Sequence, residues 1–204
     1  MIIQDIVKAV NKLSNRRQSR YFSVDEITEA INDAVLDMFN EGRSEFEKTQ
    51  VVNDLLRVFK AKSTIALTEG EGDLPADYAS LTGFEDNIDV VTDERWGEVK
   101  NDVICPADSD YPVLNIYGAK VRVLPNTITE VDINYLKKPT KAVYGKTLSE
   151  NGRDYIFSEA GSTDVEIPAH RAPELLAKTL KYLGVSLKQT DLTQFELLKN
   201  QTDK

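Results

Sequence analysis

The residue types that most often do chemistry are scarce in this sequence. It contains one histidine, His170, and one cysteine, Cys105. A zinc site with several His or Cys ligands, a His–His acid/base pair and an intramolecular disulfide are therefore excluded. His170 has no nucleophile or partner at a marked spacing, and Cys105 precedes Pro106 in a setting typical of a small core residue. We predict that neither residue is catalytic.

Two groups of carboxylates are candidates for a cation site. Asp25, Glu26 and Glu29 fall in the first turns of a predicted helix, where they complement the helix dipole. The acids of residues 69–73 alternate with glycines, but they lack the twelfth-position glutamate of a calcium loop and the third glycine and lysine of a phosphate loop. We expect no metal, no cofactor and no catalytic residue. A hydrolase that uses paired carboxylates remains a minor alternative.

The charge balance argues against a protein that grips nucleic acid. Asp and Glu number 34 against 25 Lys and Arg, which gives a formal charge of −9, whereas phosphate binding requires a basic surface. The 204 residues suit one domain with a sizeable core. The first residues lack the design of a signal peptide, and no apolar run reaches the roughly 20 residues of a membrane helix. We therefore expect a protein made in a cytoplasm.

Periodicity predicts helices at both ends of the chain. An apolar stripe predicts a helix over 2–14, and a Ser23–Glu26 capping box opens a longer one from about 24 to the mid-40s. A short helix is predicted around 50–57. Near the C-terminus, a leucine-lined helix ends at Gly184, and a last helix covers about 191–200.

The middle of the chain predicts strands. Alternating apolar residues indicate a strand over 58–67, two short strands within 81–92, a hairpin over 112–124 and a half-buried strand over 130–136. A short helix is predicted over 92–103, with Val103 on its apolar side. Helices, then strands, then helices make an α+β fold. We expect one domain over 1–204, with helical parts 1–57 and 169–202 packed together and a β-rich part over 58–168.

Interface residues are predicted in three places. Arg16, Arg17 and Arg20 form a concentrated basic patch, and arginine pairs well with carboxylates. Residues 140–165 are polar and turn-rich, with an apolar patch that includes Tyr155 and Phe157. We expect this loop to be ordered only by a partner. The last predicted helix adds Phe195 and Leu198.

The layout as a whole resembles a known family. The N-terminal helix pair is followed by Leu-Pro-Ala-Asp-Tyr at 74–78, Val-Arg-Val-Leu-Pro at 121–125, a strand that ends in Tyr-Leu-Lys-Lys-Pro at 135–139, and a leucine-rich C-terminal helix pair. This layout resembles the head-to-tail connector proteins (adaptors, or ring proteins) of tailed bacteriophages. It is most similar to the ring proteins below the portal in short-tailed phages, of which the crAss-like group is one.

The resemblance implies a structural part of the virion, located in the neck and assembled in the host cytoplasm. Copies of the protein, twelve in the usual arrangement, would form a ring that docks on the portal protein, contacts further tail proteins and continues the DNA channel. Double-stranded DNA would pass without specific binding, and no membrane, catalytic residue or cofactor is implied. A ring of such acidic subunits would repel passing phosphates.

Two further alternatives remain open. One is a β-rich ligand-binding or tail accessory module with the exposed aromatics Tyr111, Tyr117, Tyr144 and Tyr155 as its platform; helices at both ends are unusual for such modules. The other is a neck or tail-completion protein of the same virion region.

Overall fold

A computed structural model of the chain describes residues 2–16, 22–44, 53–54, 56–84, 88–149 and 155–185. The α+β class is confirmed, with helices in the outer parts of the sequence and mainly antiparallel strands between them. The chain divides into two compact units, where its length predicts one domain. Residues 1–58 and 139–204 form the helical unit, and residues 59–138 form the β unit.

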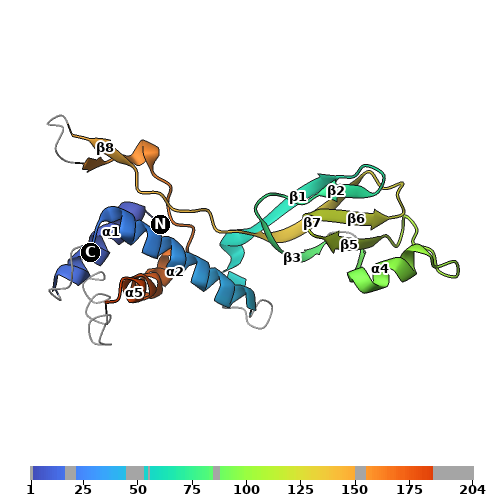
Figure 1. Cartoon of the computed structure of the whole chain (residues 1–204), viewed down its shortest axis with the longest axis horizontal. Coiled ribbons are helices and arrows are strands. Elements are labelled where there is room, and N and C mark those ends of the chain that lie inside the picture. The colour runs from blue at the N-terminus through green and yellow to red at the C-terminus, as the bar shows by residue number, and fades with distance from the viewer. Residues whose placement is uncertain are drawn as a thin grey trace. The chain divides into compact units, whose positions relative to one another are not determined.

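The main α-helices of the helical unit are α1 (Ile3–Arg16), α2 (Val24–Ser44) and α5 (Ala172–Tyr182). They lie together in Figure 1, and both α1 and α2 contact α5. Their predicted apolar stripes are buried in one core, in which Ile3, Ile31 and Leu180 are fully covered. The helices therefore form because each buries one face against the other two.

Local signals set the ends of these helices as predicted. The Glu26 N–H donates to Ser23 Oγ at 3.2 Å, and the Ser23 N–H donates to Glu26 Oε2 at 2.8 Å, which completes the capping box before α2. After α5, Gly184 has φ +74°, and the Val185 N–H donates to the Leu180 carbonyl at 2.8 Å. A glycine in the left-handed region is the usual helix stop.

Two small sheets make up the β unit. The first has strand order β1-β7-β3, from Lys60–Ala66, Glu130–Lys137 and Tyr78–Phe84, and is antiparallel. The second has order β2-β6-β5-β4, from Glu71–Asp73, Lys120–Leu124, Val113–Tyr117 and Asp89–Val90. Only its β4–β5 pair is parallel. Both sheets contribute to one core, which includes Ile65, Leu114, Val121 and Ile133.

Helix α4 (Asp93–Lys100) is shorter than predicted. It buries no residue completely, and it ends three residues before Val103, which is 91% exposed. Cys105 is exposed as well, so the expectation that it is a core residue was wrong. The apolar spacing from Trp96 to Val103 suggested one helical face, but the Asp102 carboxylate accepts backbone N–H groups of the following turn and favours a loop there.

Residues 139–168 depart from the sequence prediction. They belong to the helical unit, not to the β-rich part, because Ala142, Val165 and Ile167 are buried in the helical core. They also contain a two-stranded hairpin, β8 (Lys146–Leu148) and β9 (Tyr155–Phe157), so the expectation of a loop throughout was wrong for these strands. Short 3-10 turns lie at Arg57–Phe59 (η1), Glu159–Gly161 (η2) and Ala169–Arg171 (η3).

Candidate interaction surfaces

The structure places only part of the predicted interface. Arg16 is the last residue of α1, whereas Arg17, Arg20, Phe195 and Leu198 lie outside the described residues. Tyr155 and Phe157 are both in β9. Phe157 is half-buried and packs against the helical core, with its ring centroid 4.9 Å from that of Tyr144 in an edge-to-face arrangement. Phe157 therefore anchors the hairpin to its own chain.

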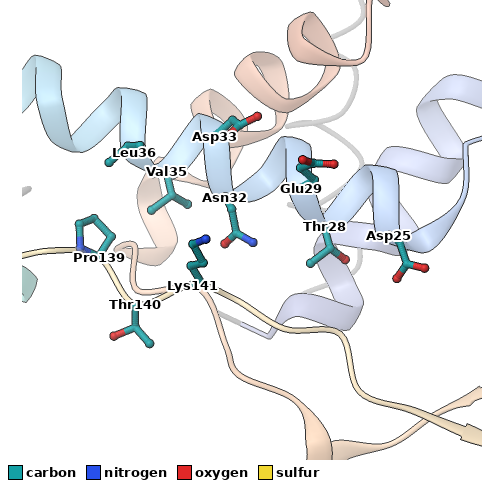
Figure 2. Close-up of a pocket in the computed structure, with 10 residues that line it drawn as sticks. All are labelled: Asp25, Thr28, Glu29, Asn32, Asp33, Val35, Leu36, Pro139, Thr140 and Lys141. Carbon is teal, nitrogen blue, oxygen red and sulfur yellow. The ribbon is translucent and has the colours of Figure 1, made fainter.

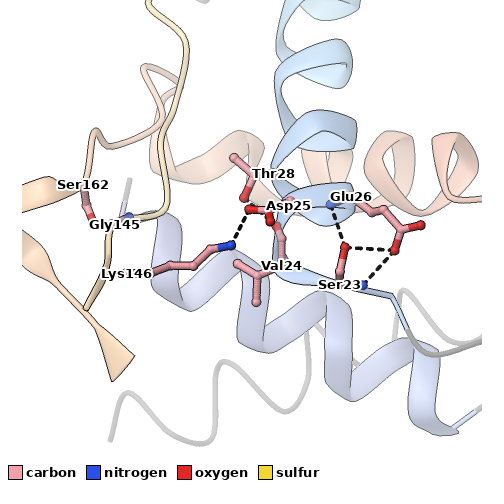
Figure 3. Close-up of polar contacts among 8 residues, drawn as sticks. All are labelled: Ser23, Val24, Asp25, Glu26, Thr28, Gly145, Lys146 and Ser162. Atoms are coloured by element: carbon pink, nitrogen blue, oxygen red, sulfur yellow. Dashed lines mark hydrogen bonds and ion pairs between the residues drawn. The ribbon is translucent and has the colours of Figure 1, made fainter. Parts of the chain in front are cut away.

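The base of the β8–β9 hairpin is held firmly to the helical unit. The Ser158 N–H donates to the Gly145 carbonyl at 3.0 Å, and the Gly145 N–H donates to Ser162 Oγ at 2.9 Å. Lys146 Nζ lies 2.5 Å from Asp25 Oδ1 in the first turn of α2 (Figure 3). Gly145 is required here, because a Cβ at this position would lie 2.4 Å from the Ser158 carbonyl oxygen.

The outer part of the same segment presents apolar side chains to solvent. Leu148 is 57% exposed on β8, Ile156 is 56% exposed on β9, and Val143 before the hairpin is 47% exposed. An isolated hairpin of this length is marginally stable, and its apolar residues favour contact with another surface. The hairpin is therefore a candidate contact region, and the interface roles of Tyr155 and Phe157 stay predictions.

A groove of about 450 Å³ runs along the outer face of α2 (Figure 2). The chain at 139–141 forms its other wall, and the half-exposed Leu36 also lines it. Asn32 joins the two walls: its Nδ2 donates to the Ala142 carbonyl at 3.0 Å, and the Ala142 N–H donates to its Oδ1 at 2.8 Å. We call this feature the α2 groove.

The charged residues that line the α2 groove are three carboxylates and one lysine, Lys141. Asp25, Glu29 and Asp33 follow one another at four-residue spacing, which puts them on one side of the helix. Asp25 is 78% exposed at its side chain. The described residues contain no group of three or more His, Cys, Asp or Glu placed to hold a metal ion.

A lysine clamp joins α5 to the next turns of α2. Lys178 Nζ lies 2.6 Å from Asp37 Oδ2 and 2.7 Å from Glu41 Oε1. Burial by itself would lower the pKa of Lys178, but the hydrogen bonds to the two carboxylates outweigh it and the pKa is raised. This contact stabilises the helix pair in its charged form.

Negative charge is concentrated in the β unit. Residues 59–138 contain 15 aspartates and glutamates against eight lysines and arginines, a formal charge of −7 out of the −9 of the whole chain. All the described acids of this unit are exposed except the half-buried Asp132. Lys62 and Thr64 hydrogen-bond to Asp132 and lower the pKa of its carboxyl. The β unit therefore presents an acidic surface, while the helical unit is nearly neutral.

A small polar pocket of about 280 Å³ is also present in the β unit. It is lined by Trp96, Lys100 and Arg122 together with the acids of the β1–β2 turn. Arg122 Nε lies 3.5 Å from Glu71 Oε1, and its guanidinium carbon is 4.4 Å from the ring centroid of Tyr117. Arg122 is therefore engaged with groups of the same chain.

The aromatic platform of the ligand-binding alternative is divided between the two units. Tyr111 and Tyr117 belong to the β unit, while Tyr144 and Tyr155 belong to the helical unit. One face of Tyr117 is covered by Arg122, and Tyr144 packs on Phe157. The ring of Tyr111, which is 66% exposed, is accessible for stacking.

His170 lies in η3 and is exposed, as a surface histidine would be. No helix within the described parts of the chain is both long and apolar enough to cross a membrane. No protein-family model matches the chain, and no curated protein matches it significantly.

Sequence reasoning missed the α2 groove and the lysine clamp. The four-residue spacing of acids from Asp25 to Glu41 is visible in the sequence and could have indicated an acidic helix face. The pairing of Asn32 with Ala142, by contrast, has no local signal because the two residues are 110 positions apart.

Proposed function

We propose that this protein is a structural component of the neck of a tailed bacteriophage. Its copies, twelve in the arrangement that the resemblance implies, form a ring that joins the portal protein to further tail proteins. The ring continues the DNA channel, and its subunits meet head to tail through contacts that close by rotation. The working location is the virion, and the protein turns over no substrate.

The observation that carries this proposal is the separation of charge between the two units. The β unit carries −7, and its described acids are almost all exposed. Twelve copies would bring a total charge on the order of −100 to the ring. Such a surface repels the phosphates of a nearby duplex at short range, within a Debye length of about 8 Å at physiological salt. DNA would pass without being held.

The helical unit offers what assembly requires. Leu36 in the α2 groove and Leu148 and Ile156 on the hairpin are each about half exposed in the single chain. Exposed apolar side chains next to charged ones are typical of contacts that form on assembly. Exposed apolar side chains for assembly, together with an acidic β unit that repels DNA, support a ring subunit over an enzyme.

The charge argument is tested with two double charge-reversal variants of equal net charge. Asp73→Lys with Glu130→Lys alters exposed acids of the β unit, and Asp5→Lys with Glu159→Lys alters exposed acids of the helical unit. Both variants change the formal charge from −9 to −5. Binding of a fluorescent duplex is measured at low and physiological salt.

We expect no retention of duplex by the original protein and salt-sensitive retention by the β-unit variant, at least several-fold stronger than for the helical-unit variant. Equal binding of the two variants would show that the location of the charge has no role. Tight binding by the unaltered protein would contradict the proposed function itself.

A further inference from the structure

The most exposed apolar side chains of the described chain lie in one loop of the β unit. This loop, residues 101–111, connects α4 to β5. Val103 is 91% exposed and Ile104 is 92% exposed, far above the 40–66% of the other large exposed hydrophobic residues. A scattered exposed side chain needs no explanation, but two adjacent ones that are almost wholly exposed do.

Hydrogen bonds hold the loop in a defined shape at both ends. Asp102 Oδ1 accepts the N–H groups of Ile104 at 2.8 Å and Cys105 at 3.1 Å. Asp108 Oδ1 accepts those of Asp110 at 2.9 Å and Tyr111 at 2.8 Å. Asp102 therefore fixes the turn that contains the apolar pair, and Asp108 fixes the turn that follows it, so the pair is presented outward at a low cost in conformational entropy.

The charge around the apolar pair limits what can cover it. The loop contains three acids, Asp102, Asp108 and Asp110, and no basic residue. Backbone hydrogen bonds from Cys105 and Ile104 lower the pKa of Asp102, so that carboxylate stays charged. Nucleic acids and anionic membrane surfaces are repelled by such a loop.

The pockets of the described residues offer a second copy of this chain no apolar socket with a net positive rim. In the α2 groove three carboxylates outnumber one lysine, Lys141, and a smaller groove between α2 and the end of α5 is lined by Glu26, Glu29 and Asp33. Both would repel the acids of the loop. In the polar pocket of the β unit, Glu69 and Glu71 balance the charges of Lys100 and Arg122, and Arg122 already contacts Glu71 and Tyr117.

We propose that the 101–111 loop is a docking element, and that Val103 and Ile104 insert into an apolar socket, rimmed by lysine or arginine, on a different protein. The partner is a protein because the apolar pair needs a packed socket, and the rim is basic because three carboxylates flank the pair. The inference rests on the proposed function in one respect: the partners tested are the proteins that would adjoin this one in a neck.

The test uses purified portal protein and the purified next neck protein of the same virus as probes. The main variant carries Val103→Ser and Ile104→Ser, which remove only exposed side chains and leave the core intact. Ile2→Ser removes another half-exposed apolar side chain and serves as the control. Asp110→Asn tests the charge contribution, since this side chain holds neither turn. Cys105, the only cysteine, reports burial of the loop through its alkylation rate.

We expect one of the two probes to slow alkylation of Cys105 at least tenfold. The double serine variant should weaken binding of that probe at least tenfold. Asp110→Asn should weaken binding severalfold and reduce its salt dependence. Ile2→Ser should leave binding unchanged. Binding that leaves Cys105 reactive and survives the double substitution would overturn the docking role and leave the proposed function standing. Protection of Cys105 by self-association or by phosphatidylglycerol vesicles would overturn it as well. Failure of both probes to bind would overturn the docking role and the proposed function together.

Discussion

Substitution of Gly145 by alanine should release the β8–β9 hairpin from the helical unit. The added Cβ would lie 2.4 Å from the Ser158 carbonyl oxygen and 2.6 Å from the Gly161 carbonyl carbon, whereas ordinary contacts begin near 3.4 Å. These obstacles are backbone atoms and cannot rotate away. The two chain segments must therefore separate by roughly 1 Å.

The cost can be estimated from the contacts that such a movement breaks. The hydrogen bonds from Ser158 N–H to the Gly145 carbonyl and from Gly145 N–H to Ser162 Oγ, at 3.0 and 2.9 Å, would both be lost or badly stretched. Each is worth about 1 kcal/mol net, and overpacking adds about 1–3 kcal/mol. We expect a loss of about 3 kcal/mol in the free energy that holds the hairpin base closed.

Gly161→Ala is the matched control, because its added Cβ would meet only the Gly145 Cα at an ordinary 3.6 Å. Amide hydrogen exchange of Ser158 measures local opening, and urea unfolding followed by far-ultraviolet circular dichroism measures the helical unit. Gly145→Ala should speed exchange at Ser158 by about a hundredfold, while the control changes it little. Equal exchange in the two variants would refute the close crossing of Gly145 over Ser158 and Gly161.

Three other predictions concern stability. Lys178→Met should destabilise the α2–α5 pair by about 1–2 kcal/mol in urea unfolding, because Asp37 and Glu41 lose their shared cation while the side-chain stem is kept. The difference in unfolding free energy should shrink in high salt. An effect below a few tenths of a kcal/mol would contradict the clamp. Since the pKa of Lys178 is raised in the folded state, its contribution to stability should be complete at neutral pH and be lost as the pH rises above about 10.5. The unfolding free energies of the unaltered protein and Lys178→Met should therefore converge at high pH. Convergence at acidic pH would contradict this reasoning. Glu69→Asn should raise the stability of the β unit by about 1 kcal/mol. Glu69 has φ +54° in the tight turn between β1 and β2, and asparagine adopts this conformation more readily. A loss of stability in thermal unfolding would contradict this explanation.

Features with a local signal could be predicted from the sequence. The buried stripes of α1 and α2, the Ser23–Glu26 capping box and the φ of Gly184 follow from periodicity and capping chemistry that act within a few residues. The β5–β6 hairpin and strand β7 also lie where alternation placed them. These elements define the α+β class, which is why the structure confirms the predicted fold class.

Features that depend on distant partners could not be predicted. Ala142 is far from Val165 and Ile167 in the sequence, and only their burial in the helical core shows that 139–168 belongs to the helical unit. The exposure of Val103 follows from two hydrogen bonds to Asp102 that a helical periodicity cannot reveal. The α2 groove likewise exists only because Asn32 pairs with the backbone of Ala142.

Ring formation is tested most directly by the mass of the purified protein in complex with the portal protein of the same virus, measured by native mass spectrometry. A closed ring of twelve 22.9 kDa chains would add roughly 275 kDa to the portal assembly, in one discrete step without partial occupancies. A portal assembly whose mass is unchanged, or a graded series of one or two added chains, would contradict the account.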